Sequence, residues 1–144
     1  MKKKIGIGLL VVLGVIQFIQ VDKNNPAVIE NQSYEDVVAV PDTEKELIIN
    51  ACYDCHSNTT AYPWYFSVQP LGWYLKGHVN GGRGKLNFSE WASLNSDEQR
   101  HAKEECVEIL EKKWMPLKSY TWLHGEAKLS EEQRAQLVEW FKSK

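Results

Sequence analysis

Apolar residues recur at helical spacing along most of this chain, and no segment shows the strict alternation of a half-buried strand. The first helix is expected to run from about Thr43 into residues 52–56. Thr43 and Glu46 form the residue pair typical of a helix start, and acidic residues crowd the first turn, where the helix dipole favours them. The polar run 57–60 is expected to stop this helix.

A second helix is expected after Pro70, because proline is favoured in the first turn of a helix. His78 falls on the apolar stripe of that helix. The stripe is formed by Leu71, Tyr74, Leu75 and His78, at positions i, i+3, i+4 and i+7. Three glycines within residues 80–84 predict that the helix breaks there into a tight loop. Because glycine has no side chain, such a loop would let the backbone approach a flat ligand closely.

Two more helices are expected toward the C-terminus, each opened by a capping pair. Ser96 with Gln99 begins a helix that runs to about Lys113, and Ser130 with Gln133 begins the last one. Their apolar faces hold Ala102, Cys106, Ile109 and Leu110 in the former, and Leu137, Val138 and Phe141 in the latter. The pattern therefore predicts a small all-α domain of about four helices, with Cys106 packed in its core.

The N-terminus has the pattern of an export signal that stays attached. Lys2, Lys3 and Lys4 precede an apolar run over residues 5–21, and no small-residue cleavage site follows. Seventeen residues at ~1.5 Å each would reach about 25 Å, the short end of a membrane span. We expect a single-pass anchor in a bacterial inner membrane, with the rest of the chain in the periplasm, because flanking lysines stay in the cytoplasm. The alternative is a protein secreted to the periplasm after cleavage.

The chain divides on this basis into an anchor at 1–21, a tether at 22–41 and one domain at 42–144. Residues 22–144 hold 14 basic and all 19 acidic residues, which is a net charge of −5. This charge argues against a nucleic-acid partner, which would require a basic face. It is compatible with a redox partner protein, while the membrane would be contacted through the anchor.

The residues with the most specific chemistry are Cys52-Tyr53-Asp54-Cys55-His56, which spell C-x-x-C-H. Two thiols about one helical turn apart can each add to a vinyl group on the same porphyrin edge. The adjacent His56 is then held under the iron as its proximal ligand. This spacing predicts one covalently bound haem c.

Two other interpretations of the cysteine pair stay open. A redox dithiol would place C-x-x-C after a strand and at the start of a helix, whereas here a helix precedes it. A zinc site would need two further soft ligands at finger-like spacing, and only Cys106 and three scattered histidines remain.

Met115 is the expected sixth iron ligand, because it lies in a loop before the last helix and is followed by Pro116. His78 is the alternative, since it faces an apolar stripe. We interpret His124 as a loop or helix-end residue, and His101 as a residue of a polar helix face.

Two further residues are expected at the cofactor. Arg83 has the planar guanidinium that pairs with a carboxylate such as a propionate, although a solvated surface role is an equal alternative. Trp64 is expected to wall the pocket, and Trp114 is a second candidate among six tryptophans.

These residues together resemble the bacterial haem-binding domain family, whose members are small anchored or secreted proteins similar to c-type cytochromes and common in the Bacteroidetes group. The resemblance covers about residues 40–143. It rests on C-Y-D-C-H-S-N at 52–58, Y-P-W-Y at 62–65, H-V-N at 78–80, G-R at 82–83, L-N-F-S-E-W at 86–91, M-P-L-K-S-Y at 115–120 and H-x-x-A-K-L-S at 124–130. It implies covalent haem at Cys52, Cys55 and His56. The order of helix, C-x-x-C-H, methionine loop and closing helix is also similar to class I cytochromes c, which favours Met115.

We therefore expect a cytochrome c-like helical domain around one haem, acting as an electron carrier and not as an enzyme. A haem-based sensor with an open or histidine-ligated sixth site is the main alternative. A peroxidase-like protein would need a distal acid–base residue, for which His78 and Glu90 are the candidates.

Overall fold

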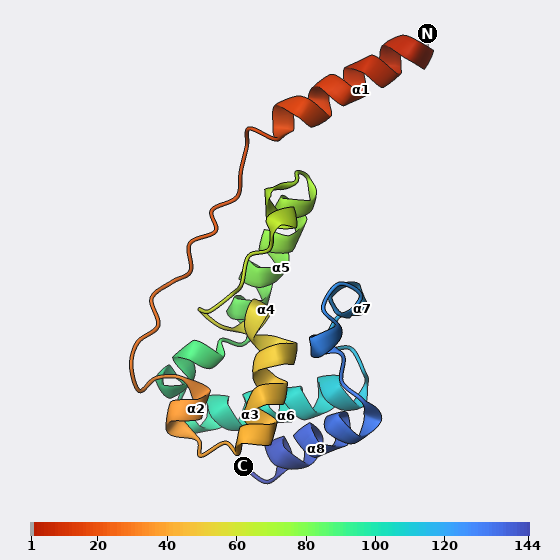
Figure 1. The fold of residues 1–144 in the computed structure, drawn as a ribbon. Coiled ribbons are helices and arrows are strands. Elements are labelled where there is room, and N and C mark those ends of the chain that lie inside the picture. The colour runs from red at the N-terminus through yellow and green to blue at the C-terminus, as the bar shows by residue number, and fades with distance from the viewer. Residues whose placement is uncertain (1) are drawn as a thin grey trace.

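The computed structural model describes residues 2–144, and within that range every regular element is a helix and there is no strand (Figure 1). This confirms the all-α class. The α-helices are α1 (Lys2–Ile16), α2 (Tyr34–Val37), α3 (Asp42–Ile48), α4 (Asp54–His56), α5 (Leu71–Lys85), α6 (Ser96–Glu111), α7 (Lys118–Thr121) and α8 (Glu131–Lys142). A π-helical segment, η1 (Ile49–Tyr53), joins α3 to α4, and the 3-10 segments are η2 (Trp64–Ser67), η3 (Phe88–Ser93) and η4 (Gly125–Ala127).

The hydrophobic core lies where α6 and α3 pack against α8. Its centre is aromatic: Tyr34 meets Trp91 edge to face at 4.7 Å between ring centroids, and Trp91 stacks on Phe88 at 6.3 Å. Tyr34 belongs to the segment 22–41 that we interpreted as a tether, yet it is 1% exposed and accepts a hydrogen bond from Trp140 Nε1 at 2.9 Å. This part of the segment is therefore built into the domain.

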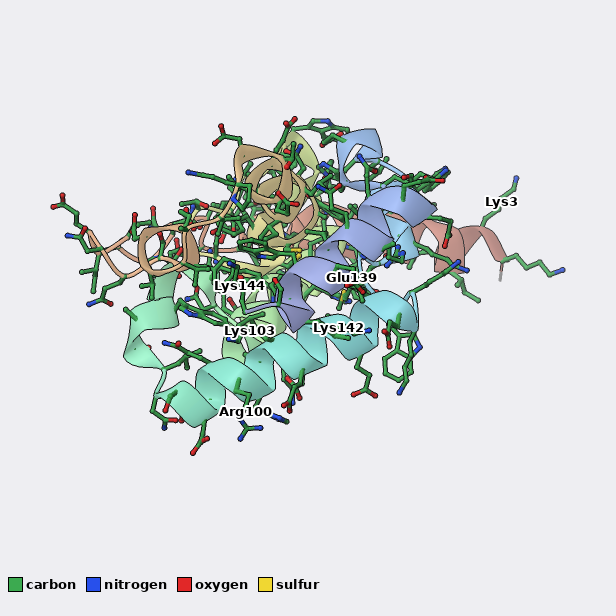
Figure 2. All side chains as sticks on the ribbon, turned by 90° about the horizontal axis from the view of Figure 1, so that it is seen from below. Lys3, Arg100, Lys103, Glu139, Lys142 and Lys144 are labelled. Carbon is green, nitrogen blue, oxygen red and sulfur yellow. The ribbon has the colours of Figure 1, made fainter. Side chains whose placement is uncertain are left out.

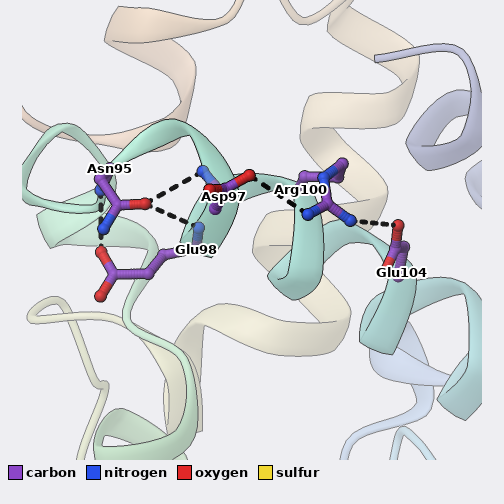
Figure 3. A network of polar contacts seen from close by, with 5 residues as sticks. All are labelled: Asn95, Asp97, Glu98, Arg100 and Glu104. Carbon is purple, nitrogen blue, oxygen red and sulfur yellow. Dashed lines mark hydrogen bonds and ion pairs between the residues drawn. The ribbon is translucent and has the colours of Figure 1, made fainter.

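The start of α6 lies one residue away from the predicted capping pair. The cap is Asn95, whose side-chain oxygen accepts from the backbone amides of Asp97 and Glu98 at 3.0 Å each, while Glu98 accepts from the Asn95 amide (Figure 3). Arg100 then pairs with Asp97 and Glu104 along the exposed face of the helix. The Ser130/Gln133 cap of α8 is confirmed, with Gln133 N donating to Ser130 Oγ.

Helix α1 is shorter than the apolar run that predicted it. It ends at Ile16, and the side-chain amide of Gln17 then donates to the carbonyls of Leu13 at 2.8 Å and Gln69 at 2.9 Å. Within residues 2–144, no helix combines the length and the apolar character needed to cross a membrane. The transmembrane helix expected within residues 1–21 is therefore not supported.

Helices α4 and α5 pack closely, and Gly82 of α5 makes this possible. The predicted loop at 80–84 is wrong, because α5 continues through these residues to Lys85. Gly82 faces Cys55, and a Cβ at this position would lie 2.4 Å from the Cys55 carbonyl oxygen. The absence of a side chain at Gly82 thus sets the distance between the helix that carries the cysteines and α5.

Replacing Gly82 by alanine should destabilise the chain by about 1–3 kcal/mol, because the added methyl group overlaps the Cys55 carbonyl and must push the two helices apart. Gly84→Ala is the matched control on the same helix, where nothing lies within 4 Å of an added Cβ. This control should be neutral or stabilise by up to about 1 kcal/mol, since alanine is the better helix former. Urea unfolding of the two variants measures the difference, and equal stabilities would contradict the packing described.

Candidate functional site

A cavity of about 880 Å³ lies among α4, α5, α6 and the loop that leads into α7. This volume is in the range of pockets that hold cofactors or other small molecules. Four of the residues singled out from the sequence meet in its wall: Cys55, His56, His78 and Met115. The structure therefore brings residues from three separate stretches of sequence to one cavity.

The imidazole of His56 is oriented by the chain itself. Its Nδ1 lies 3.0 Å from the carbonyl oxygen of Leu86, which can only accept, so Nδ1 carries the proton and Nε2 keeps its lone pair. Burial lowers the pKa of His56, which favours the neutral ring that can ligate a metal. A histidine whose other nitrogen is held by a backbone carbonyl is the usual arrangement of a metal ligand.

The two cysteines lie near the C-terminal end of the continuous helical stretch formed by α3, η1 and α4. Cys52 belongs to η1 and Cys55 to α4, and a smaller cavity of about 40 Å³ is lined by Cys52, His56 and Met115 among others. Both cysteines are free thiols, and burial raises the pKa of Cys52 to about 12 and that of Cys55 to about 11. A reactive dithiol sits instead at a helix N-terminus with a depressed pKa, so this environment disfavours that interpretation.

Both candidate sixth ligands reach the large cavity. His78 lines it from α5, with Nδ1 3.0 Å from the Tyr74 carbonyl, which leaves its Nε2 free as in His56. Met115 lines it from the loop after α6, and its carbonyl accepts a hydrogen bond from Arg134 at 2.7 Å. Position alone therefore does not separate the two residues.

Arg83 lies outside the cavity walls, contrary to the expectation for a cofactor contact. Its guanidinium donates to the Ser57 carbonyl at 2.7 Å, to Thr60 Oγ1 at 2.8 Å and to Asn25 Oδ1 at 2.7 Å. These bonds fix the turn that follows His56, because a planar guanidinium with several donors can hold several acceptors at once. The basic side chain that does line the large cavity is Lys85, two residues after Arg83.

Trp64 and Trp114 also lie outside the cavity walls. Their indoles are 78% and 60% exposed, and Trp114 lies under the Lys112 ammonium at 4.5 Å. The sequence singled out Trp64 and Trp114, but the tryptophan that contributes to the large cavity is Trp73. A count of aromatic residues carries no information on which of them face inward.

Asn58, two residues after His56, joins the end of the cysteine motif to two other segments of the chain. This buried side chain accepts from Asn87 Nδ2 at 2.9 Å and donates to the Ala27 carbonyl and to Glu90, while its backbone amide donates to Ser89 Oγ. Glu90, a distal acid–base candidate in the sequence, is thus occupied at this junction and lines neither of the larger cavities.

The variable positions of C-x-x-C-H are also tied down, which the sequence did not reveal. Tyr53 donates to Glu35 of the α2 segment, and Asp54 accepts from Tyr120 Oη at 2.7 Å and from the Ala61 amide at 3.0 Å. The only signal for Tyr120 was its place at the end of M-P-L-K-S-Y. Tyr53 and Asp54 therefore connect the motif to both ends of the chain.

A second, more apolar cavity of about 280 Å³ adjoins the first, and the two share Cys55, His78 and Tyr120 in their walls. His124 lies here, where Nε2 is 2.5 Å from Tyr65 Oη and the ring stacks on Tyr120 at 4.3 Å between centroids. His124 therefore has a packing role in the described structure.

The surface that α5 presents to the large cavity is partly bare backbone. Gly77 and Gly81, one helical turn apart, line the cavity, and a Cβ at either would meet nothing within 4 Å. A flat group could therefore lie directly on this helix. The approach of glycine backbone to a flat group stays a prediction, and the structure places Gly81 of the predicted run in a helix and not in a loop.

Among residues 2–144, no three His, Cys, Asp or Glu side chains gather as a metal cluster would require. The zinc interpretation of Cys52 and Cys55 therefore finds no support in the described part of the chain.

Comparison with known families gives one clear result. The chain matches the family described as haem-binding domain over residues 11–143, which is almost its whole length. Neither a curated protein nor a solved structure matches it.

The environment of the thiols predicts their reactivity in the chain without a cofactor. Burial favours the neutral thiol, so the rate of alkylation of Cys52 and Cys55 by iodoacetamide should still be rising at about pH 10. The same chain in denaturant is the control and should titrate near the ordinary thiol value of about 8.5. Peptide mass spectrometry follows each cysteine, and a rate plateau near neutral pH would instead indicate a redox dithiol.

Proposed function

Because the chain belongs to the haem-binding domain family, we propose that it attaches one haem covalently through Cys52 and Cys55 and carries single electrons. The observation that supports this most strongly is the shared cavity of about 880 Å³, where Cys55 and His56 meet Met115. A c-type site needs two thiols on one porphyrin edge and an imidazole beneath the iron, and the motif provides these three groups on one helix.

The residues present fit this cofactor. Most of the cavity wall is apolar, the bare backbone of Gly77 and Gly81 admits a flat group, and His56 keeps Nε2 free. When bound, haem supplies the one-electron chemistry. The chain contributes the rest: the Leu86 carbonyl holds the His56 proton on Nδ1, and Leu86, Ile109 and Pro116 contribute apolar surface to the cavity wall.

We assign the sixth ligand to Met115, since a thioether on a loop opposite the histidine is the arrangement of electron-carrying cytochromes c. His78 is the alternative, and one observation favours it: its Nδ1 is also held by a backbone carbonyl, which leaves Nε2 available toward the cavity. A histidine-ligated or open sixth site would suit a haem-based sensor.

An electron carrier accounts for the site better than a peroxidase does. A peroxidase needs an acid–base residue on the distal side, and Glu90, one of the two candidates, is hydrogen-bonded to Asn58 away from the cavity. The other candidate, His78, does line the cavity, where it is also the alternative sixth ligand. We propose that the protein is an electron carrier and not an enzyme. Its partners in this proposal are redox proteins that exchange electrons with it.

We propose that the domain works in the bacterial periplasm. Lys2–Lys4 followed by an apolar run is typical of an export signal, and covalent haem attachment takes place on that side of the membrane. Appearance of the haem-loaded chain in a periplasmic fraction would agree with this, and its confinement to the cytoplasm would not.

Replacing Met115 and His78 one at a time shows which of them is the sixth ligand. After expression with a c-type maturation system, the oxidised wild type should show a low-spin spectrum with the weak long-wavelength band of sulfur-to-iron charge transfer. Met115→Ala should lose that band and bind CO in the reduced form, because the sixth position becomes open. His78→Ala should keep both the band and the resistance to CO.

If His78→Ala instead binds CO in the reduced form and Met115→Ala resists it, the sixth ligand is His78 and not Met115. A high-spin spectrum of the wild type that binds CO readily would favour a sensor. His101→Ala provides the control, since His101 lies on an exposed helix face and pairs with Glu105.

Gly81→Ala should reduce haem incorporation, because the new methyl group projects from α5 into the large cavity where the flat group would lie. Gly84→Ala lies one turn further along the same helix and outside the cavity wall, so it should load haem normally. Haem per polypeptide, measured by pyridine haemochrome absorbance, compares the two. Equal loading would show that this face of α5 does not contact the cofactor.

A further inference from the structure

A set of exposed aromatic and apolar side chains covers the end of the domain nearest to α1. Trp122, Leu123 and Tyr74 are 87%, 61% and 58% exposed, and all three border the second cavity together with Leu71. Trp64 packs edge-on against Tyr65, which lines the same cavity, with 5.9 Å between ring centroids. We call Trp64, Leu71, Tyr74, Trp122 and Leu123 the aromatic rim. A contiguous exposed set of this kind marks a contact surface, unlike single exposed residues.

The aromatic rim is continuous with α1. Gln17, at the end of α1, exchanges two hydrogen bonds with Gln69, and Trp73 Nε1 donates to the Ile19 carbonyl at 2.9 Å. These contacts join α1 to the segment that carries Trp64 and the start of α5 (Figure 1). Helix α1 has no buried residue, and its apolar side chains are exposed on every face. A helix that is apolar all round requires an apolar environment.

Charge distinguishes this end of the molecule from the other. Residues 55–89 contain no Asp or Glu, although the chain has 19, and Lys76 is their basic residue in the half of α5 that carries Leu71 and Tyr74. Figure 1 shows α6 and α8 far from α1, and together these two helices contain nine Asp and Glu residues against four Lys and Arg residues. Figure 2 labels some of the charged side chains at this end, namely Arg100, Lys103, Glu139, Lys142 and the C-terminal Lys144. Three of the five rim residues, Trp64, Leu71 and Tyr74, therefore lie in a segment that an anionic surface would not repel. Near the other two, the exposed Glu126 is paired with His124 at 3.2 Å.

We propose that the aromatic rim rests on the surface of a lipid bilayer that contains anionic headgroups. Tryptophan and tyrosine concentrate at membrane interfaces because their rings are apolar and their N–H or O–H groups reach water. Helix α1 contacts the same lipid, and the absence of acidic residues in 55–89 lowers the repulsion between the headgroups and the part of the rim that holds Trp64, Leu71 and Tyr74. The acidic residues of α6 and α8 then point into the aqueous space. This inference does not depend on haem, so it can fail while the proposed function stands.

Radical footprinting of the full-length chain on vesicles tests the proposal without a substitution. The vesicles contain phosphatidylcholine with phosphatidylglycerol, and flotation separates bound protein. Residues 1–63 contain no tryptophan, so protection of tryptophan reports the domain and not α1. Trp64 and Trp122 should be protected severalfold, whereas Trp114 should not, because it lies outside the rim although it is 60% exposed.

A pair of variants gives the second measurement. Replacing Trp64 and Trp122 by serine should weaken vesicle binding roughly tenfold or more, because two indoles no longer leave water on binding. Trp114→Ser is the matched control and should bind as the wild type does. Failure of the chain to float, or equal footprints at Trp64, Trp122 and Trp114 on floated protein, would overturn the proposal. Protection of the rim only after a protein partner is added would likewise overturn it.

Discussion

The site depends on how closely α5 approaches the helix that carries the cysteines. Gly82 allows this contact, since any side chain there would overlap the Cys55 carbonyl. The approach also carries the chain from α5 back to Leu86, whose carbonyl binds His56 Nδ1 at 3.0 Å. The close contact at Gly82 thus fixes the position of the helix that presents the cysteines and also the tautomer of His56. The same two helices form one side of the large cavity, and α6 and the loop that leads into α7 form the rest of its wall.

A second set of contacts holds the cysteine motif in place from outside the cavity. Arg83 and Asn58 fix the turn after His56, and Tyr120 holds Asp54 within the motif. These side chains leave the cavity wall mostly apolar, because the polar groups near the motif are satisfied by each other. A site organised before a cofactor enters avoids the entropic cost of ordering these groups afterwards. The same contacts join the N-terminal segment, α5 and the C-terminal loop, so that distant parts of the sequence hold the five residues of the C-x-x-C-H motif in place.

Much of the fold was predictable from local signals. The capping pair at Ser130, the apolar faces of the last two helices and the burial of Cys106 all follow from spacing, and the structure agrees. The glycine run was misassigned because glycine is read as a helix breaker, whereas packing against Cys55 favours a helix there. Arg83 was assigned to a propionate because residue type alone does not show which acceptors lie nearby. Its partners Ser57, Thr60 and Asn25 come from two other segments, and such contacts cannot be derived from spacing. Which of Met115 and His78 binds iron stays a prediction.

Covalent attachment at the cysteine pair is the central claim of this account, and intact-mass spectrometry under denaturing conditions tests it most directly. The chain would be produced with a c-type maturation system, unfolded, and digested to locate any added group. We predict that one haem remains attached after unfolding, on the peptide that contains both Cys52 and Cys55, with neither thiol open to alkylation. Loss of all haem on unfolding, with both thiols free, would contradict the account.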